Sequence, residues 1–154
     1  MATTAMPPSA GGNNPGANMA AAVDAEIAKF RELQEEVSKL RSDVQLLIGQ
    51  MNENEMVKQE LALLDDGANV FKMVGPVLMK NDLDDAKQTV DKRLEFIAGE
   101  RKRKEKLMTD KESKANDIAR KVQEMQGRMQ QAAVEAARAI AAEQQQQQQQ
   151  AGGN

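Results

Sequence analysis

The stretch Leu61–Lys80, LALLDDGANVFKMVGPVLMK, decides the fold of this chain. Asp65–Gly67 indicates the end of a helix, and two short apolar runs follow it, Asn69–Val74 and Val77–Lys80, separated by Gly-Pro. Two such runs around a glycine-containing turn predict a β-hairpin over about residues 69–80. An isolated hairpin is marginally stable in water, and its outer edges carry unpaired backbone groups. We therefore expect it to complete a sheet with hairpins from other chains.

Both faces of this hairpin are apolar. Successive side chains of a strand point to opposite faces, so a two-residue loop places the apolar residues in two sets. One set is Phe71, Met73 and Leu78, and the other is Val70, Val74, Val77 and Met79. Which set lines the interior of the assembled sheet depends on the loop length and stays open. Two apolar faces are typical of a strand pair enclosed in an assembly, so these seven residues are the predicted assembly surface.

A heptad pattern precedes the hairpin and predicts a helix over about residues 24–65, with Asp24 as its N-cap or first-turn acid. The spacings of three and four are typical of a coiled-coil seam. The seam residues are Phe30, Leu33, Val37, Leu40, Val44, Leu47, Met51, the polar Asn54, Val57, Leu61 and Leu64.

A second helix is predicted over about residues 82–135, with Asn81 or Asp82 as its N-cap and two aspartates in its first turn. Its seam residues are Val90, Leu94, Ile97, Arg101, Lys104, Met108, Lys111, Ala115, Ile118, Val122, Met125 and Met129. Two helices of similar length joined by a short insertion fold back on each other. The fold class is therefore mainly α, a long antiparallel two-helix coiled coil joined by one β-hairpin, with the hairpin at one end and both termini at the other.

The charged seam positions of the second helix, Arg101, Lys104 and Lys111, predict a looser, water-accessible stretch. The basic run at residues 101–106 admits two interpretations, a nuclear-localisation or nucleic-acid patch and a solvated helix face. We favour the solvated face, balanced by acids of the first helix, because no aromatic residue interleaves with the run. The expected balancing acids are Glu36, Glu53 and Glu55.

The composition limits the possible functions. The 154 residues have a net charge of −3, 2% aromatic residues, no cysteine and no histidine. Disulfides, thiolate metal sites and histidine chemistry are therefore excluded, and no phosphate-binding glycine motif is present. No apolar run approaches the roughly 18 residues of a membrane span, and the N-terminus lacks signal-peptide features. We predict a protein that is not an enzyme and uses no cofactor or metal, with no nucleic-acid or membrane partner.

The two ends of the chain have biased compositions. Residues 1–22 are rich in Pro, Gly and Asn, and residues 136–154 form an Ala/Gln-rich low-complexity segment. Such segments bury too little apolar surface to offset the entropy of ordering. Residues 1–22 are therefore predicted to be a disordered tail, and the C-terminal segment is predicted to be disordered from Glu143, or frayed helix at the start of that stretch. They flank a domain at residues 23–135.

Three segments resemble prefoldin β-type subunits. Asn54–Asp65 is similar to the end of the first helix in that family, Val70–Lys80 to its hairpin, and Lys92–Ile97 to the start of its second helix. The resemblance covers about residues 24–135, and the hairpin is its specific part. The sequence departs from the family pattern at the seam charges Arg101 and Lys104, and also at Gly99 and Gly127.

The resemblance implies a heterohexameric co-chaperone of two α-type and four β-type subunits, so the partners of this chain would be two α-type and three further β-type subunits. The hairpins of that family form a double β-barrel, and its six coiled coils bind unfolded proteins at their tips. Its clients include actin and tubulin, which it passes to the cytosolic group II chaperonin without using nucleotide. The implied location is the cytoplasm.

The tip of the coiled coil is the expected client-binding region, because several weak contacts at flexible tips sum to useful avidity and methionine adapts to varied shapes. Its residues are Val23, Ile27, Phe30, Leu33, Ile118, Val122, Met125 and Met129. Any one of them could instead only close the coiled coil. A rival interpretation of the whole chain is a structural coiled-coil scaffold or tether, which would be stable alone and would not act on unfolded clients. A nucleic-acid-associated helical protein is a third.

Overall fold

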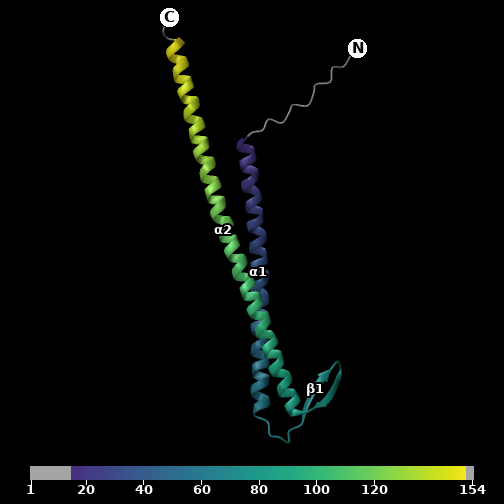
Figure 1. The fold of residues 1–154 in the computed structure, drawn as a ribbon. Helices are drawn as coiled ribbons and strands as arrows, with labels where there is room; N and C mark the ends of the chain where they lie inside the picture. Colours follow the sequence, from purple (N-terminus) through teal and green to yellow (C-terminus); the bar gives the residue numbers. More distant parts are fainter. Residues whose placement is uncertain (1–14, 152–154) are drawn as a thin grey trace, which may run out of the picture. The chain divides into compact units, whose positions relative to one another are not determined.

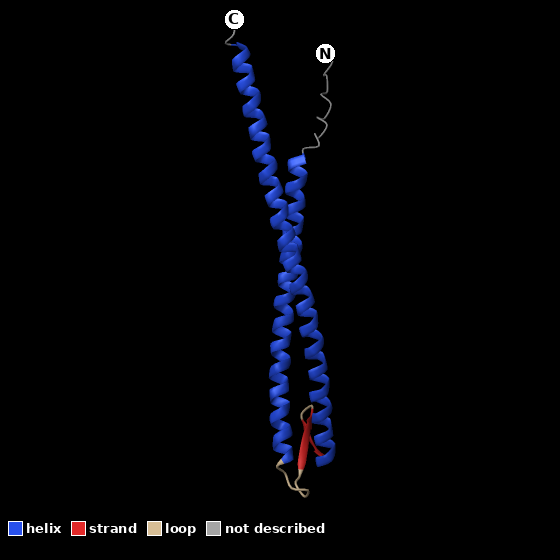
Figure 2. Ribbon diagram, turned by 60° about the vertical axis from the view of Figure 1, so that its left-hand side comes forward, coloured by secondary structure: helices blue, strands red, loops and turns tan. Residues whose placement is uncertain are grey.

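The computed structural model describes residues 15–151, which form two long antiparallel helices joined by a β-hairpin (Figures 1 and 2). The predicted mainly α fold is confirmed. The elements are α1 (Pro15–Ala62), β1 (Val70–Val74), β2 (Val77–Asn81) and α2 (Leu83–Ala151).

These residues divide into two compact units. The hairpin unit comprises residues 33–114 and contains the hairpin with the helical segments on either side of it. The terminal unit comprises residues 15–32 of α1 and 115–151 of α2.

The hairpin has the predicted two-residue loop and lies within one residue of the predicted bounds. β1 and β2 are antiparallel, and Val74 pairs with Val77 across Gly75-Pro76. Gly75 has a φ of 60°, and the proline ring holds φ near −65° at the next residue. A positive φ followed by a negative one indicates a type II′ turn, which suits the twist of a hairpin. Because Met73 lies opposite Leu78 and Lys72 opposite Met79, the register also confirms the predicted apolar sets of the two faces.

A small apolar cluster anchors the hairpin to the helices of its unit. Leu61 from α1 and Leu83, Ala86 and Val90 from α2 are buried together, with Val70 and Leu94 packed against them. Val70 is half-buried, unlike the rest of β1. The hairpin is therefore held at its first residue, and the remainder of both strands extends beyond the cluster.

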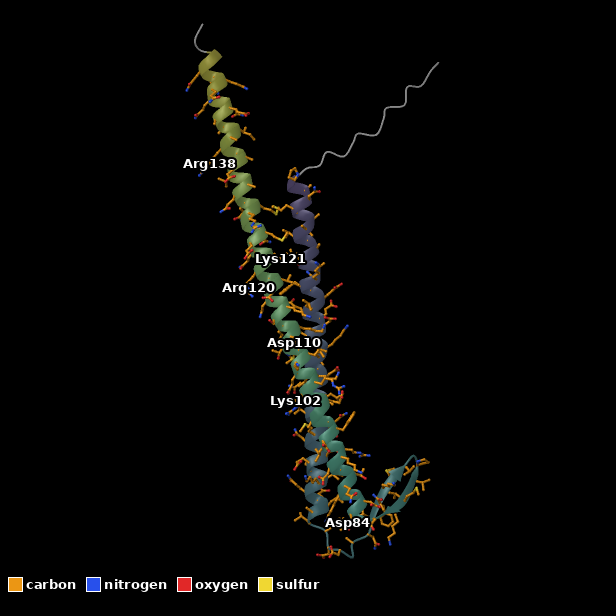
Figure 3. All side chains as sticks on the ribbon, viewed as in Figure 1. Asp84, Lys102, Asp110, Arg120, Lys121 and Arg138 are labelled. Carbon is orange, nitrogen blue, oxygen red and sulfur yellow. The ribbon has the colours of Figure 1, made fainter. Side chains whose placement is uncertain are left out.

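Hydrogen bonds define the helix ends around the hairpin. The Asp84 N–H donates to Asp82 Oδ1 at 2.8 Å, which confirms Asp82 as the N-cap of α2. Asp84 and Asp85 occupy the first turn, as predicted, where the helix dipole favours acids (Figure 3). α1 ends at Ala62, before the predicted Asp65, so the predicted seam residue Leu64 lies in a turn and is exposed.

The predicted seams meet in the hairpin unit. Val37, Leu40 and Val44 of α1 are buried, as is Ile97 of α2. Leu33, Leu47, Met51, Asn54, Leu94, Arg101, Lys104, Met108 and Lys111 are half-buried. The predicted seam residue Val57 is instead exposed.

Ion pairs between the helices accommodate the charged seam positions. Lys111 Nζ lies 2.6 Å from Glu36 Oε2, and Lys104 Nζ lies 2.6 Å from Asp43 Oδ2. The partner number on α1 rises as the number on α2 falls, as antiparallel helices require. Glu36 pairs with Lys111, outside the basic run at residues 101–106. Among the described residues no ion pair joins that run to Glu36, Glu53 or Glu55, so this prediction of the balancing acids was wrong.

Asp43 replaces those acids because the helix register brings it opposite Lys104. The third seam cation, Arg101, places its buried Nε 3.5 Å from Glu105 Oε1 on its own helix, without hydrogen-bond geometry.

The helices extend further than predicted. α1 begins at Pro15, so disorder over residues 15–22 and an N-cap role for Asp24 were wrong, while residues 1–14 lie outside the described part. Alanine has the highest helix propensity, and Ala20–Ala22 follow a proline that fits the first turn. The helix end predicted near residue 135 and the disorder predicted from Glu143 were also wrong within the described residues, because α2 continues through Ala and Gln, both good helix formers, to Ala151.

Candidate functional site

The hairpin presents apolar side chains to solvent on both faces. The set Phe71, Met73 and Leu78 is exposed, with Met73 at 73%, and so are Val74, Val77 and Met79 of the other set. We call these six residues together with the half-buried Val70 the hairpin surface. β1 and β2 pair only with each other in the part of the chain that the structure describes, which leaves the outer edge of each strand unpaired.

This arrangement indicates an interaction site. A contiguous exposed apolar patch on a small protein marks a protein–protein interface, and an unpaired strand edge accepts a further strand through main-chain hydrogen bonds. The structure brings all seven predicted assembly residues onto one two-stranded element, as the sequence predicts.

Most of the predicted tip residues lie together in the terminal unit. Val23 is buried, while Ile27, Phe30, Ile118, Val122, Met125 and Met129 are half-buried. The eighth, Leu33, falls in the hairpin unit. Half-buried apolar side chains close the helix pair and still present part of their surface to solvent.

An open groove of about 510 Å³ runs between the two helices of the terminal unit. Three predicted tip residues, Ile27, Phe30 and Val122, give it an apolar wall. Its other lining residues are Asn116, Ala119, Arg120 and Gln123. Arg120 also forms an ion pair with Asp117 on its own helix. The groove has the size and lining to receive an apolar side chain.

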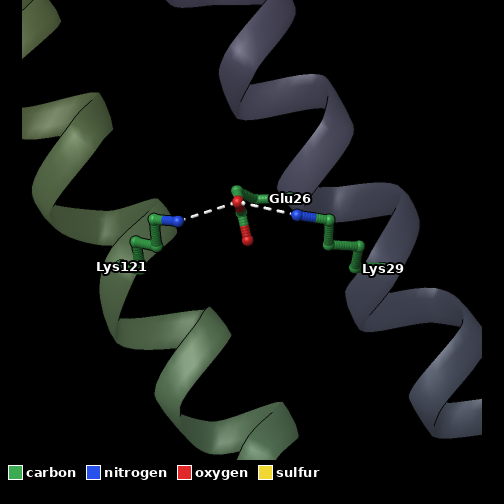
Figure 4. A network of polar contacts seen from close by, with 3 residues as sticks. All are labelled: Glu26, Lys29 and Lys121. Atoms are coloured by element: carbon green, nitrogen blue, oxygen red, sulfur yellow. Dashed lines mark hydrogen bonds and ion pairs between the residues drawn. The ribbon is translucent and has the colours of Figure 1, made fainter.

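A charged contact ties the two helices of this unit together (Figure 4). Glu26 Oε1 accepts a hydrogen bond from Lys121 Nζ of α2 at 2.8 Å and one from Lys29 Nζ at 3.2 Å. The hydrogen bond from Lys121, and after it that from Lys29, lowers the pKa of the Glu26 carboxyl. Glu26 was not among the residues predicted from the sequence, although it lies between Val23 and Phe30 at seam spacing, and that spacing could have identified it.

The end of α2 was also missed, because residues 136–154 were assigned to a low-complexity tail. Every side chain from Gln130 to Gln149 is exposed, including Val134 and Ile140. Arg138 is on this stretch, which continues past the start of α1 within the terminal unit (Figure 3). It therefore offers helix surface that α1 does not cover.

Within residues 15–151 the structure shows no group of three or more His, Cys, Asp and Glu that could hold a metal ion. Among the same residues, no helix is sufficiently long and apolar to cross a membrane.

Comparison with known proteins gives consistent matches. The model of the prefoldin subunit family matches residues 24–129. Prefoldin subunit 6 of Bos taurus and that of Homo sapiens are each 42% identical over 114 residues, 74% of this chain and 87% of theirs. Prefoldin subunit 6 of Arabidopsis thaliana is 44% identical over 81 residues, 53% of this chain and 63% of its own.

A crystal structure of the prefoldin beta subunit from Thermococcus strain KS-1 is similar at 21% identity. The similarity covers 71% of this chain and 90% of that chain, with a TM-score of 0.46.

Prefoldin subunits are chaperone subunits without enzymatic activity. The family match spans most of the chain, from the start of the coiled coil through the hairpin and along α2. This chain therefore belongs to the prefoldin subunit family, as a β-type subunit homologous to prefoldin subunit 6.

Proposed function

We propose that this chain assembles through its hairpin into a cytoplasmic heterohexamer with two α-type and three further β-type prefoldin subunits. The observation that carries this proposal is the hairpin surface, which is apolar on two exposed faces and ends in two unpaired strand edges. A neighbouring hairpin would pair with an edge through main-chain hydrogen bonds and bury one face or both. The assembling domain is residues 23–135.

The proposed activity of the assembled complex is to bind unfolded proteins and deliver them to the group II chaperonin without ATP. In this chain the terminal unit supports that role, because half-buried apolar residues flank an open groove. Weak contacts from several such units would sum to useful avidity while each one remains reversible. Met125 and Met129 suit varied client surfaces because their unbranched side chains adapt in shape. We propose actin and tubulin as clients.

Assembly is tested by Phe71→Asp. Phe71 is 56% exposed in this chain, so a carboxylate there leaves the isolated fold nearly unchanged but cannot be buried in an interface. We expect the variant to fold, by far-UV circular dichroism, and to be absent from complexes purified with the other subunits. A matched control is Leu46→Glu, because Leu46 is a similarly exposed leucine, 63%, on α1. A Phe71→Asp chain recovered at wild-type yield would contradict the assembly role.

Client binding is tested in the assembled complex by replacing Val122, Met125 and Met129 with serine. The expected result is a normal hexamer that suppresses aggregation of denatured actin less well than the wild type, measured by light scattering. Leu107→Ser is the control, because Leu107 is an exposed apolar residue of α2 in the hairpin unit. Equal suppression by the triple variant and the wild type would refute the assignment of these residues.

A further inference from the structure

The hairpin carries positive charge and no carboxylate. Between Asn69 and Asn81 the only charged residues are Lys72 and Lys80. Both are exposed, and neither forms an ion pair with any residue that the structure describes. The register puts Lys72 opposite Met79 and Lys80 opposite Phe71, so each apolar face carries one lysine.

The acidic groups of the same region lie at the base of the hairpin, outside its strands. Asp66, Asp82 and Asp84 line a polar groove of about 360 Å³, and Lys80 lines it with them. Lys80 therefore shares its groove with three carboxylates. Lys72 does not line the groove and lies at the middle of β1. Lys72 is therefore the hairpin lysine that does not share this groove with the acids, and neither strand of the hairpin contains an acid.

The position of Lys72 determines what the outer edge of β1 can pair with. β1 has five residues, and Lys72 is the third. When two copies of β1 pair antiparallel with full overlap, each Lys72 lies directly opposite the other, with Cβ atoms about 5 Å apart. Like charges directly opposite each other in a sheet are destabilising, whereas opposite charges are stabilising.

We propose that the outer edge of β1 selects a strand from a different subunit, one that places an aspartate or glutamate opposite Lys72, and disfavours a second copy of this chain. The inference rests on the proposed hetero-assembly and specifies the chemistry of the neighbour. The apolar residues supply the contact area on either face, and they do not by themselves distinguish one apolar hairpin from another. A lysine on an exposed strand edge also opposes self-association. In the free chain, Lys72 would therefore disfavour pairing with a second copy in the same way.

The first experiment measures incorporation of the full chain into complexes with the remaining subunits, by competition against tagged wild type. We expect Lys72→Glu to compete about tenfold less well at low salt, because the neighbouring carboxylate then faces a like charge. Lys72→Gln should fall between Lys72→Glu and the wild type. Raising the salt concentration should reduce the difference. Lys39→Glu is the control, an exposed lysine on α1 with the same change of charge.

The second experiment mixes copies of this chain alone. Wild type and Lys72→Glu together should associate more strongly than either alone at low salt, because only the mixture opposes a lysine to a glutamate. If Lys72→Glu competes like the wild type while Phe71→Asp is excluded, charge does not select the neighbour and this inference fails while the proposed function stands. If wild type itself does not assemble with the other subunits, the proposed function and the inference both fail.

Discussion

Two leucines at the end of α1 offer a direct test of what holds the hairpin in place. Leu61 is 8% exposed and belongs to the cluster that contacts Val70, whereas Leu63, just past the end of the helix, is 85% exposed. Complete burial of a leucine side chain stabilises by about 1.5–3 kcal/mol, and truncation to alanine in a core costs about 2–5 kcal/mol. The cluster is small, and no side chain among the described residues is buried below 2% exposure. We therefore expect the low end for Leu61→Ala, about 2–3 kcal/mol.

The assay is urea unfolding of the full chain followed by far-UV circular dichroism. With a typical slope of about 1–3 kcal/mol per molar urea, Leu61→Ala should lower the midpoint by about 1 M or more. Leu63→Ala, which removes the same atoms from an exposed site, should change the free energy of unfolding by less than about 0.5 kcal/mol. Equal midpoints for the two variants would show that the cluster does not hold this end of the protein together.

Three further changes test separate contacts. The pKa of Glu26 is lowered in the folded state, so the stability it contributes is present above its ordinary pKa and is lost as pH falls through the folded value. The thermal midpoints of wild type and Glu26→Gln should therefore converge as the pH is lowered from neutral to below the ordinary pKa of a glutamate. Gly75→Ala should destabilise the fold by about 1 kcal/mol, because φ is 60° at that residue. Gly127→Ala should stabilise the fold by up to about 1 kcal/mol, because Gly127 is exposed in a helix with open space around it. Urea midpoints that shift in the same direction for both variants would contradict this. Lys104→Met should raise the free energy of unfolding by about 0.5–1 kcal/mol, seen as a higher urea midpoint, because a seam position prefers an apolar side chain and half-exposed Asp43 stays hydrated. A lower midpoint would show that the ion pair stabilises the fold more than an apolar side chain does.

The hairpin and its helices could be predicted because each is determined by local chemistry. Gly75-Pro76 forms a tight two-residue turn, and that turn fixes the strand register and the division of apolar residues between two faces. The N-cap at Asp82 follows from the same short-range logic. Heptad spacing likewise identified the residues buried between the helices, including Val37 and Ile97.

The features that were not predicted depend on more than the spacing of apolar residues along the sequence. Asp43 rather than Glu53 or Glu55 pairs with the seam cation Lys104, because the helix register decides which acid faces that lysine. The helical ends were missed because a compositional rule for disorder gave Pro, Gly and Gln more weight than the helix propensity of alanine. The Glu26 contact was missed because the predicted seam of the first helix began at Phe30, four residues after Glu26.

Native mass spectrometry of the complex purified through an affinity tag on this chain tests the central claim, that the hairpin surface is an assembly element. The expected result is a heterohexamer of six similar small chains that includes this one. The heterohexamer should not form with the Phe71→Asp variant. A lone chain or a homodimer from the wild type would contradict it, and would leave a coiled coil with an exposed hairpin that has no partner strand.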